Sequence, residues 1–104
     1  MLTEDLPLIV TNAVEVSGWD HNDAFFVEKS ELLSDEFATK YVALEHRIPN
    51  GSLVFLRTLQ SFQMHRPNPI AFEVEFLGTD SQGLQQFRLN DAQSRYSRLS
   101  CLVN

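Results

Sequence analysis

Residues 70–77, Ile-Ala-Phe-Glu-Val-Glu-Phe-Leu, alternate between apolar and acidic side chains, and this pattern restricts the fold more than any other feature. One register is wholly apolar and consists of Ile70, Phe72, Val74 and Phe76. Glu73 and Glu75 occupy the other register and would point to water. A period of two is typical of an antiparallel strand with one face on the core and one in solvent. The stretch therefore predicts a β-strand at the surface of a small all-β domain.

Further segments of the chain also favour strands. Residues 14–17 alternate and end at Gly18, and residues 24–33 begin with aromatic residues and carry Glu28, Ser30 and Leu32 on one register. Residues 37–44 are rich in β-branched and aromatic residues, and residues 53–59 are apolar enough for a strand covered on both faces. Turn residues punctuate these segments at Pro49-Asn50-Gly51, 66–69 and 78–83. The pattern predicts six short strands in a small antiparallel β-barrel or sandwich.

The last residues have a different period. Leu89, Ala92, Tyr96, Leu99 and Val103 recur at steps of three and four. This spacing predicts a C-terminal α-helix over about 89–103, with Asn90 as its N-cap and Asp91 in its first turn. No repeat or linker divides the 104 residues, so we expect a single domain with its barrel at about 8–80.

Charge and composition exclude several classes of protein. The net charge is −6. Residues 1–45 contain ten acidic residues and two Lys, whereas residues 46–104 contain four acidic residues and six Arg. An acidic chain without a Lys/Arg run repels nucleic acid. The chain has neither an apolar run long enough for a transmembrane helix nor the pattern of a secretion signal. With a single cysteine, Cys101, we expect a soluble cytoplasmic protein without an internal disulfide and without a cofactor.

The densest polar cluster is Asp20-His21-Asn22-Asp23. A calcium-binding loop that began at Asp20 would require oxygen ligands at its positions 1, 3, 5 and 12 and Gly at position 6. Ala24 and Phe25 stand at the fifth and sixth positions, so the cluster is better explained as a hairpin turn. A zinc site is not indicated either, because the three histidines are far apart and no Cys pair accompanies them.

Catalytic motifs are equally weak. Ser34 lies in no nucleophile-elbow turn, Cys101 has no evident base, and the chain contains no Gly-rich phosphate loop. An enzyme would require a deep pocket in which His21, His46 or His65 is hydrogen-bonded to a carboxylate. We therefore expect a protein that is not an enzyme.

The aromatic residues around the first hairpin have two interpretations. Trp19, Phe25 and Phe26, followed by Phe37 and Tyr41, either pack in the core or form an exposed recognition patch. Core packing is the default expectation.

The order of strands resembles a known family. The segments AVEVSGWD, AFFVEKSELLS, FATKYVAL, IPNGSLVFLRT and PIAFEVEFLG together resemble the PilZ domain over about residues 8–80. The resemblance implies a six-stranded β-barrel, often followed by a C-terminal helix, in a bacterial signalling protein. Members of the family that bind cyclic di-GMP carry R-x-x-x-R near the N-terminus and D/N-x-S-x-x-G at the end of the second strand.

This chain departs from both ligand motifs. The second motif maps onto residues 32–37, where Ser34 matches but Leu32 replaces the acid or amide and Phe37 replaces the Gly. The first motif is missing, because no Arg precedes Arg47. Several charge-assisted contacts of about 1.5–3 kcal/mol each would be lost.

These observations lead to one main hypothesis and two alternatives. The main hypothesis is a non-enzymatic regulatory or protein-interaction module whose protein partner is unknown, with a contact surface of Arg88, Arg95, Tyr96 and Arg98. The first alternative is a cyclic di-GMP receptor with a rearranged site, in which Ser34 remains and Arg47, Arg57 or the C-terminal Arg residues replace the missing pair. The second is self-association into a homo-oligomer through an edge strand or the stripe of residues 89–103.

Overall fold

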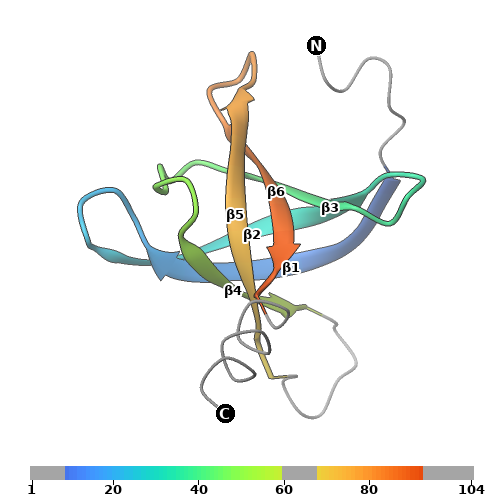
Figure 1. Cartoon of the computed structure of the whole chain (residues 1–104), viewed down its shortest axis with the longest axis horizontal. Coiled ribbons are helices and arrows are strands. Elements are labelled where there is room, and N and C mark those ends of the chain that lie inside the picture. The colour runs from blue at the N-terminus through green and yellow to red at the C-terminus, as the bar shows by residue number, and fades with distance from the viewer. Residues whose placement is uncertain (1–8, 60–67, 93–104) are drawn as a thin grey trace, which may run out of the picture.

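Six antiparallel strands make up residues 9–59 and 68–92, the part of the chain that the computed structural model describes (Figure 1). The strands are β1 (Ile9–Trp19), β2 (Phe25–Ser34), β3 (Lys40–Leu44), β4 (Leu53–Thr58), β5 (Ile70–Thr79) and β6 (Gln85–Asp91). They close into a barrel in the order β1-β2-β3-β6-β5-β4. Because β4 returns to lie beside β1, the first four strands have Greek-key connectivity. The predicted all-β, six-stranded antiparallel barrel is confirmed, although the segments named from the sequence include only five of its strands and β6 is not among them.

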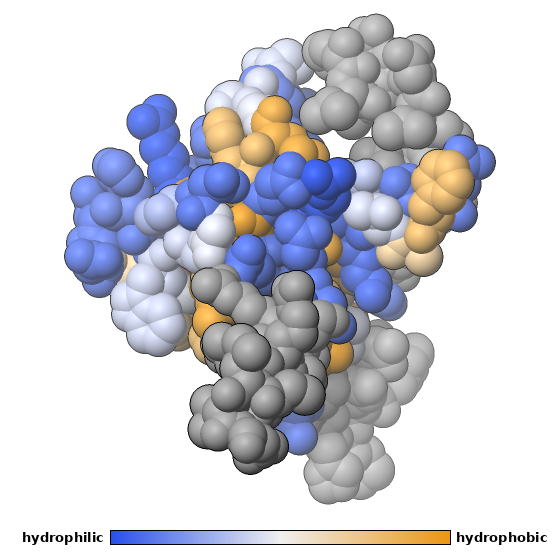
Figure 2. All heavy atoms as spheres, in the orientation of Figure 1, coloured by the Kyte–Doolittle hydropathy of each residue, from blue (hydrophilic) through white to orange (hydrophobic). Residues whose placement is uncertain are grey.

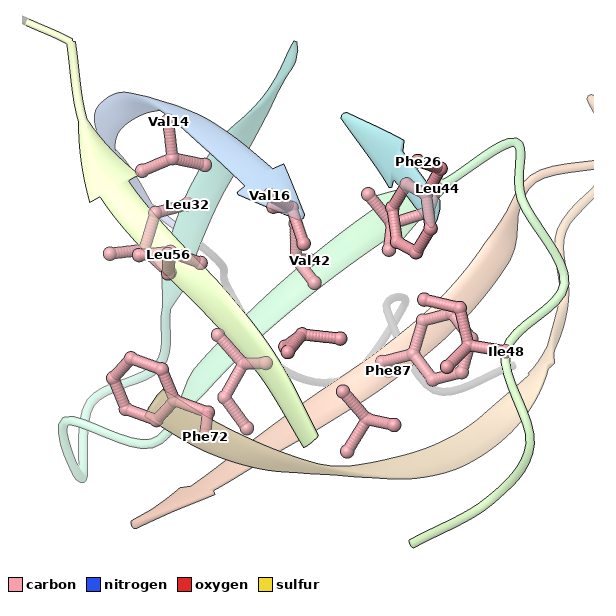
Figure 3. Packing of buried hydrophobic residues seen from close by; sticks show 13 residues of the cluster. Val14, Val16, Phe26, Leu32, Val42, Leu44, Ile48, Leu56, Phe72 and Phe87 are labelled. Atoms are coloured by element: carbon pink, nitrogen blue, oxygen red, sulfur yellow. The ribbon is translucent and has the colours of Figure 1, made fainter. Parts of the chain in front are cut away.

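Alternate residues of every strand point into the barrel and form one apolar cluster (Figure 3). The largest of the side chains that are at most 1% exposed are Val14, Val16, Val42, Leu44, Val54, Val74 and Phe87. Burying a side chain of this size stabilises the fold by about 1.5–3 kcal/mol relative to leaving it in water. No polar or charged residue is fully buried within the described part of the chain, so the centre of the barrel is apolar.

The alternation in residues 70–77 gives β5 its orientation, as predicted. Phe72 and Val74 face the core, and Glu73 and Glu75 lie on the outer face. Ile70 and Phe76 share the inward register but are 55% and 42% exposed. They lie near the ends of the barrel, where Phe76 immediately precedes a register shift in the pairing with β6.

The sixth strand corrects the predicted boundary of the C-terminal helix. Residues 85–91 pair with β3 on one side and β5 on the other, and Phe87 and Leu89 point into the core. A helix therefore does not begin at Leu89, and Asn90 and Asp91 are strand residues rather than a cap and a first turn. The barrel extends to residue 91 instead of 80, because without β6 nothing would pair with both β3 and β5. The rest of the predicted helix, residues 93–103, lies outside the described residues.

Three hairpin loops repeat the same aspartate-centred geometry. In the β1–β2 loop, Oδ1 of Asp20 accepts hydrogen bonds from the backbone N–H groups of Asn22 (2.8 Å) and Ala24 (3.0 Å). Asp35 binds residues 37 and 39 in the same way in the β2–β3 loop, and Asp80 binds residues 82 and 84 in the β5–β6 loop. An aspartate that bonds the backbone two residues ahead forms an Asx turn. The chain thus reverses direction three times by the same means.

The fourth residue of each of these loops has a positive φ. The values are 60° at Asp23, 65° at Ala38 and 86° at Gly83. Glycine adopts this left-handed conformation freely and aspartate tolerates it, whereas an alanine side chain is strained there. The loop containing Ala38 is therefore the strained member of the set.

A different turn leads into β4, where the sequence predicted one. The backbone N–H of Ser52 donates to the carbonyl oxygen of Pro49 at 3.1 Å, and Gly51 has a φ of 86°. The side chain of Asn50 accepts a hydrogen bond from the N–H of Phe76 at 2.8 Å. This contact fixes the turn to β5 across the end of the barrel.

Side chains close most of the boundary between β2 and β3. Only two residue pairs join these strands, Leu33 with Tyr41 and Ser34 with Lys40. Beyond them, the hydroxyl of Ser30 donates to the carbonyl oxygen of Ala43 at 2.7 Å. The carboxylate of Glu28 accepts the backbone N–H groups of residues 45 and 46 at 2.7 and 3.2 Å. Polar residues on the inward register of β2 thus replace backbone pairing.

Candidate functional site

Strands β2, β1 and β4 present an outer surface built from three rows of side chains, which we call the aromatic face. Cross-strand register defines each row, because residues opposite one another in adjacent strands point to the same side. The first row pairs Phe25 with Trp19, the second joins Val27, Ser17 and Phe55, and the third joins Lys29, Glu15 and Arg57.

The apolar part of this face is strongly exposed. Trp19, Phe25 and Val27 are 52%, 58% and 53% exposed, and Phe55 is half-buried. The rings of Trp19 and Phe25 meet edge to face with their centroids 5.3 Å apart. Adjacent exposed apolar side chains on one surface are a mark of interaction sites.

Core packing as the default for these aromatic residues was wrong for Trp19 and Phe25. Phe26 alone of the three first-hairpin residues is buried, at 5% exposed. Neighbouring residues of a strand point to opposite faces, so Phe25 and Phe26 cannot both enter the core. Phe37, on the β2–β3 loop, is 75% exposed, and Tyr41 is half-buried on the outer side of β3.

A shallow hollow of about 210 Å³ lies in the aromatic face. Its lining combines apolar side chains with one ion pair, in which Arg57 approaches Glu15 at 3.3 Å. The lining residues are Glu15, Ser17, Phe25, Val27, Phe55, Arg57 and Pro69. The hollow therefore mixes polar and apolar groups, as the contact surfaces of proteins do.

Ser34 and Arg47, the two residues of the ligand-binding alternative, are at opposite ends of β3. Ser34 pairs with Lys40, the first residue of β3, and its hydroxyl donates to the carbonyl oxygen of Asp35 at 3.3 Å. Arg47 follows the last residue of β3 by three positions and lines a second open hollow of about 360 Å³ that includes Phe76 and Thr79. The fold does not bring Ser34 and Arg47 together.

Arg88, the described member of the predicted partner-contact set, is held by its own barrel. Its guanidinium binds the carboxylate of Glu75, with Nε at 3.0 Å, and Tyr41 lies opposite it on β3. The hydrogen bond from Arg88 lowers the pKa of Glu75. Figure 2 shows hydrophilic surface over the middle of β5 and β6 and hydrophobic surface toward the upper end of β5. Arg95, Tyr96 and Arg98 lie outside the described residues.

Tyr41 also links β3 to the loop before it. Its hydroxyl donates to Oδ2 of Asp35 at 2.9 Å, and burial together with this bond raises the pKa of Tyr41. Partial burial of the Asp35 carboxyl opposes ionisation, but the hydrogen bonds from Tyr41, Thr39 and Phe37 outweigh it and lower the pKa of Asp35. The arrangement stabilises the loop, and it engages both the Asp35 carboxylate and the Tyr41 hydroxyl in hydrogen bonds.

His46 is hydrogen-bonded to a carboxylate, the arrangement that an enzyme would need. Its Nδ1 lies 2.6 Å from Oε1 of Glu28, and its ring stacks on Phe26 with centroids 4.5 Å apart. Both oxygens of Glu28 also accept backbone N–H groups, and the two hollows described above are lined by other residues. The pair therefore serves the closure of the β2–β3 boundary. His21 is exposed in its loop, and His65 lies outside the described residues.

The cluster Asp20-His21-Asn22-Asp23 is a hairpin turn, as the sequence indicated. The backbone hydrogen bonds from Ala24 and Asn22 lower the pKa of Asp20 and direct its carboxylate toward the loop itself. Within residues 9–59 and 68–92, no group of three or more His, Cys, Asp or Glu side chains is arranged to hold a metal ion. In the same residues there is also no helix long and apolar enough to cross a membrane.

Sequence reasoning did not single out Val27 and Phe55 as members of an exposed face. Both lie on the register opposite to the core residues Phe26 and Val54, in short runs, 25–27 and 53–56, that are apolar on both registers. That double apolar pattern was the available signal.

Comparison of the chain with protein-family models, with curated proteins and with solved structures found no match to any of them.

Proposed function

We propose that the chain is a non-enzymatic regulatory or protein-interaction module, and that its contact surface is the aromatic face. The observation that carries this proposal is the group of three neighbouring side chains, Trp19, Phe25 and Val27, each more than half exposed. Aromatic residues are enriched among the side chains that dominate the energy of protein interfaces. Arg95, Tyr96 and Arg98 remain the sequence-based alternative for the contact surface.

The proposal includes a PilZ-like barrel that has lost its ligand site, in a bacterial cytoplasm, with a helix within residues 93–103. Its support is the six-stranded closure together with the departures from both ligand motifs at Leu32, Phe37 and the N-terminal region. The distance along β3 between Ser34 and Arg47 argues against one site that uses both. A cyclic di-GMP receptor is therefore the less supported function.

A calorimetric titration of the full chain with cyclic di-GMP at moderate salt tests the loss of the ligand site. We expect no saturable heat. Saturable micromolar binding would overturn the proposal, and the variants Ser34→Ala and Arg47→Ala would then locate the site.

The contact surface is tested by affinity capture from a bacterial lysate with matched variants. Phe25→Ser combined with Val27→Thr removes apolar surface from the aromatic face, whereas Phe37→Ser removes an even more exposed ring from the β2–β3 loop. We expect the partners captured by the wild type to be kept by Phe37→Ser and lost by the double variant, with unchanged circular dichroism in all three proteins. Equal capture by the double variant and the wild type would refute this surface.

A further inference from the structure

The aromatic face carries its charges in one row only. Lys29, Glu15 and Arg57 lie side by side in the third row, whereas the first and second rows are apolar apart from Ser17. Lys29 is exposed, and Glu15 and Arg57 are paired with each other at 3.3 Å. This arrangement of cation, anion and cation restricts what can pack against the face.

Two copies of a sheet can meet face to face around either of two simple two-fold axes. A two-fold axis along β1 would place each row opposite the same row of the second copy. It would also place β2 of one copy opposite β4 of the other. Lys29 would then meet Arg57 of the other copy, and Glu15 would meet Glu15. Like charges brought together in an interface are unfavourable, so this arrangement is disfavoured.

A two-fold axis across the strands places each strand opposite the same strand of the second copy. It also places the first row of one copy opposite the third row of the other. The ammonium group of Lys29 then faces the ring of Phe25, which is a cation–π arrangement. The indole N–H of Trp19, a donor with no acceptor function, faces the carboxylate of Glu15. In the middle row Val27 meets Val27 and Phe55 meets Phe55, so the apolar centre is self-complementary.

We propose that the aromatic face binds a second copy of this chain around a two-fold axis that crosses the strands at the level of Ser17. The interface is isologous, with the same patch used by both copies and each end of the patch matched to the other end. Trp19 and Phe25 are its aromatic anchors, and Lys29 and Glu15 fix its direction. This inference names the occupant of the surface in the proposed function and rests on that function.

Sedimentation equilibrium of the full chain, from the low micromolar to the high micromolar range, tests the second copy. We expect the mass to rise with concentration toward twice the 11.9 kDa of one chain. Phe25→Ser combined with Val27→Thr should weaken association about tenfold or more, because it truncates one aromatic anchor and one residue of the apolar centre, and a few such residues dominate the binding energy of an interface. Phe37→Ser should associate as the wild type does. A wild type that stays monomeric, or a double variant that associates normally, overturns the proposal.

The direction of the axis has its own test. Lys29→Glu should weaken association, because it places a carboxylate against the Phe25 ring. With an axis along the strands the same substitution would place its new carboxylate against Arg57 and strengthen association, which would refute the crosswise axis. Lys40→Glu makes the same change of charge on β3, away from the face, and should leave association as in the wild type.

The outcomes also separate this inference from the proposed function. A monomeric wild type whose capture of other proteins still depends on Phe25 and Val27 would refute the second copy and retain the protein-contact function. A monomeric wild type whose capture of other proteins does not depend on Phe25 and Val27 would refute both the second copy and the proposed contact surface.

Discussion

Replacing Ala38 by glycine should stabilise the protein. Ala38 has a φ of 65° at the fourth position of the β2–β3 loop, where the left-handed conformation costs a non-glycine residue about 1–2 kcal/mol. Glycine also gains freedom in the unfolded chain, which offsets about 0.5–1 kcal/mol of that benefit. The two effects leave a net gain of about 0–1.5 kcal/mol, so we expect Ala38→Gly to raise the free energy of unfolding by about 0.75 kcal/mol, equivalent to roughly 3–6 °C in Tm.

The reciprocal change is available in the same molecule. Gly83 occupies the matching position of the β5–β6 loop with a φ of 86°, and a Cβ built there meets no atom within 4 Å. Gly83→Ala should therefore lose about what Ala38→Gly gains, for conformational reasons alone.

Urea unfolding followed by circular dichroism measures both changes, with Ala24→Gly as the control. Ala24 closes the β1–β2 loop without a positive φ, so glycine there should destabilise by about 0.5–1 kcal/mol. If Ala38→Gly were neutral or destabilising while Gly83→Ala had no effect, strain at the fourth loop position would be the wrong explanation.

Three further predictions concern other parts of the barrel. Glu28→Ala should lower the free energy of unfolding by about 1–3 kcal/mol, because the partly buried N–H of His46 loses its acceptor; urea unfolding should show a smaller loss for Glu28→Gln, which keeps one acceptor oxygen. The hydrogen bond from the Leu84 N–H lowers the pKa of Asp80, so the stability that its carboxylate adds is complete above its ordinary value of 3.8 and is lost as the pH falls through the lower folded-state pKa. Urea titrations over a series of pH values should show a smaller loss of stability at acid pH for Asp80→Asn than for the wild type. An equal loss in both proteins would mean that other carboxyl groups cause it. Gly18→Ala should destabilise by about 1–3 kcal/mol in the same assay, because its Cβ would lie 3.2 Å from the carbonyl oxygen of Leu53; an unchanged midpoint would mean that β4 can move aside.

A strand with one apolar and one polar register is the kind most readily located from sequence. In β5, Phe72 and Val74 alternate with two glutamates, so both the strand and its orientation follow from the residues. The last strand carries the same signal, since Phe87 and Leu89 alternate with Gln86 and Arg88. The strand was missed because Leu89 also begins a run of apolar residues with helical spacing. Where a residue fits the period of both a strand and a helix, its tertiary contacts decide which of the two forms.

The surface is harder to infer than the core. The Asx turn at Asp20 could be predicted because its hydrogen bonds are local. The aromatic face could not, because Phe25 and Phe26 are equally apolar and only the register with β1 decides which one is buried. Phe55 joins the face from a strand far along the chain, through pairing that no local pattern encodes.

The boundary between β2 and β3 has a consequence for solubility. A closed barrel is protected from aggregation because it offers no unpaired strand edge to another molecule. Here that closure depends on two residue pairs and on Glu28 and Ser30, whereas β2 is paired with β1 along its whole length. If these two side chains released β3, β2 would become an edge strand while the β1–β2 hairpin stayed folded. Glu28 and Ser30 therefore protect the chain against strand-to-strand assembly as well as stabilising its fold.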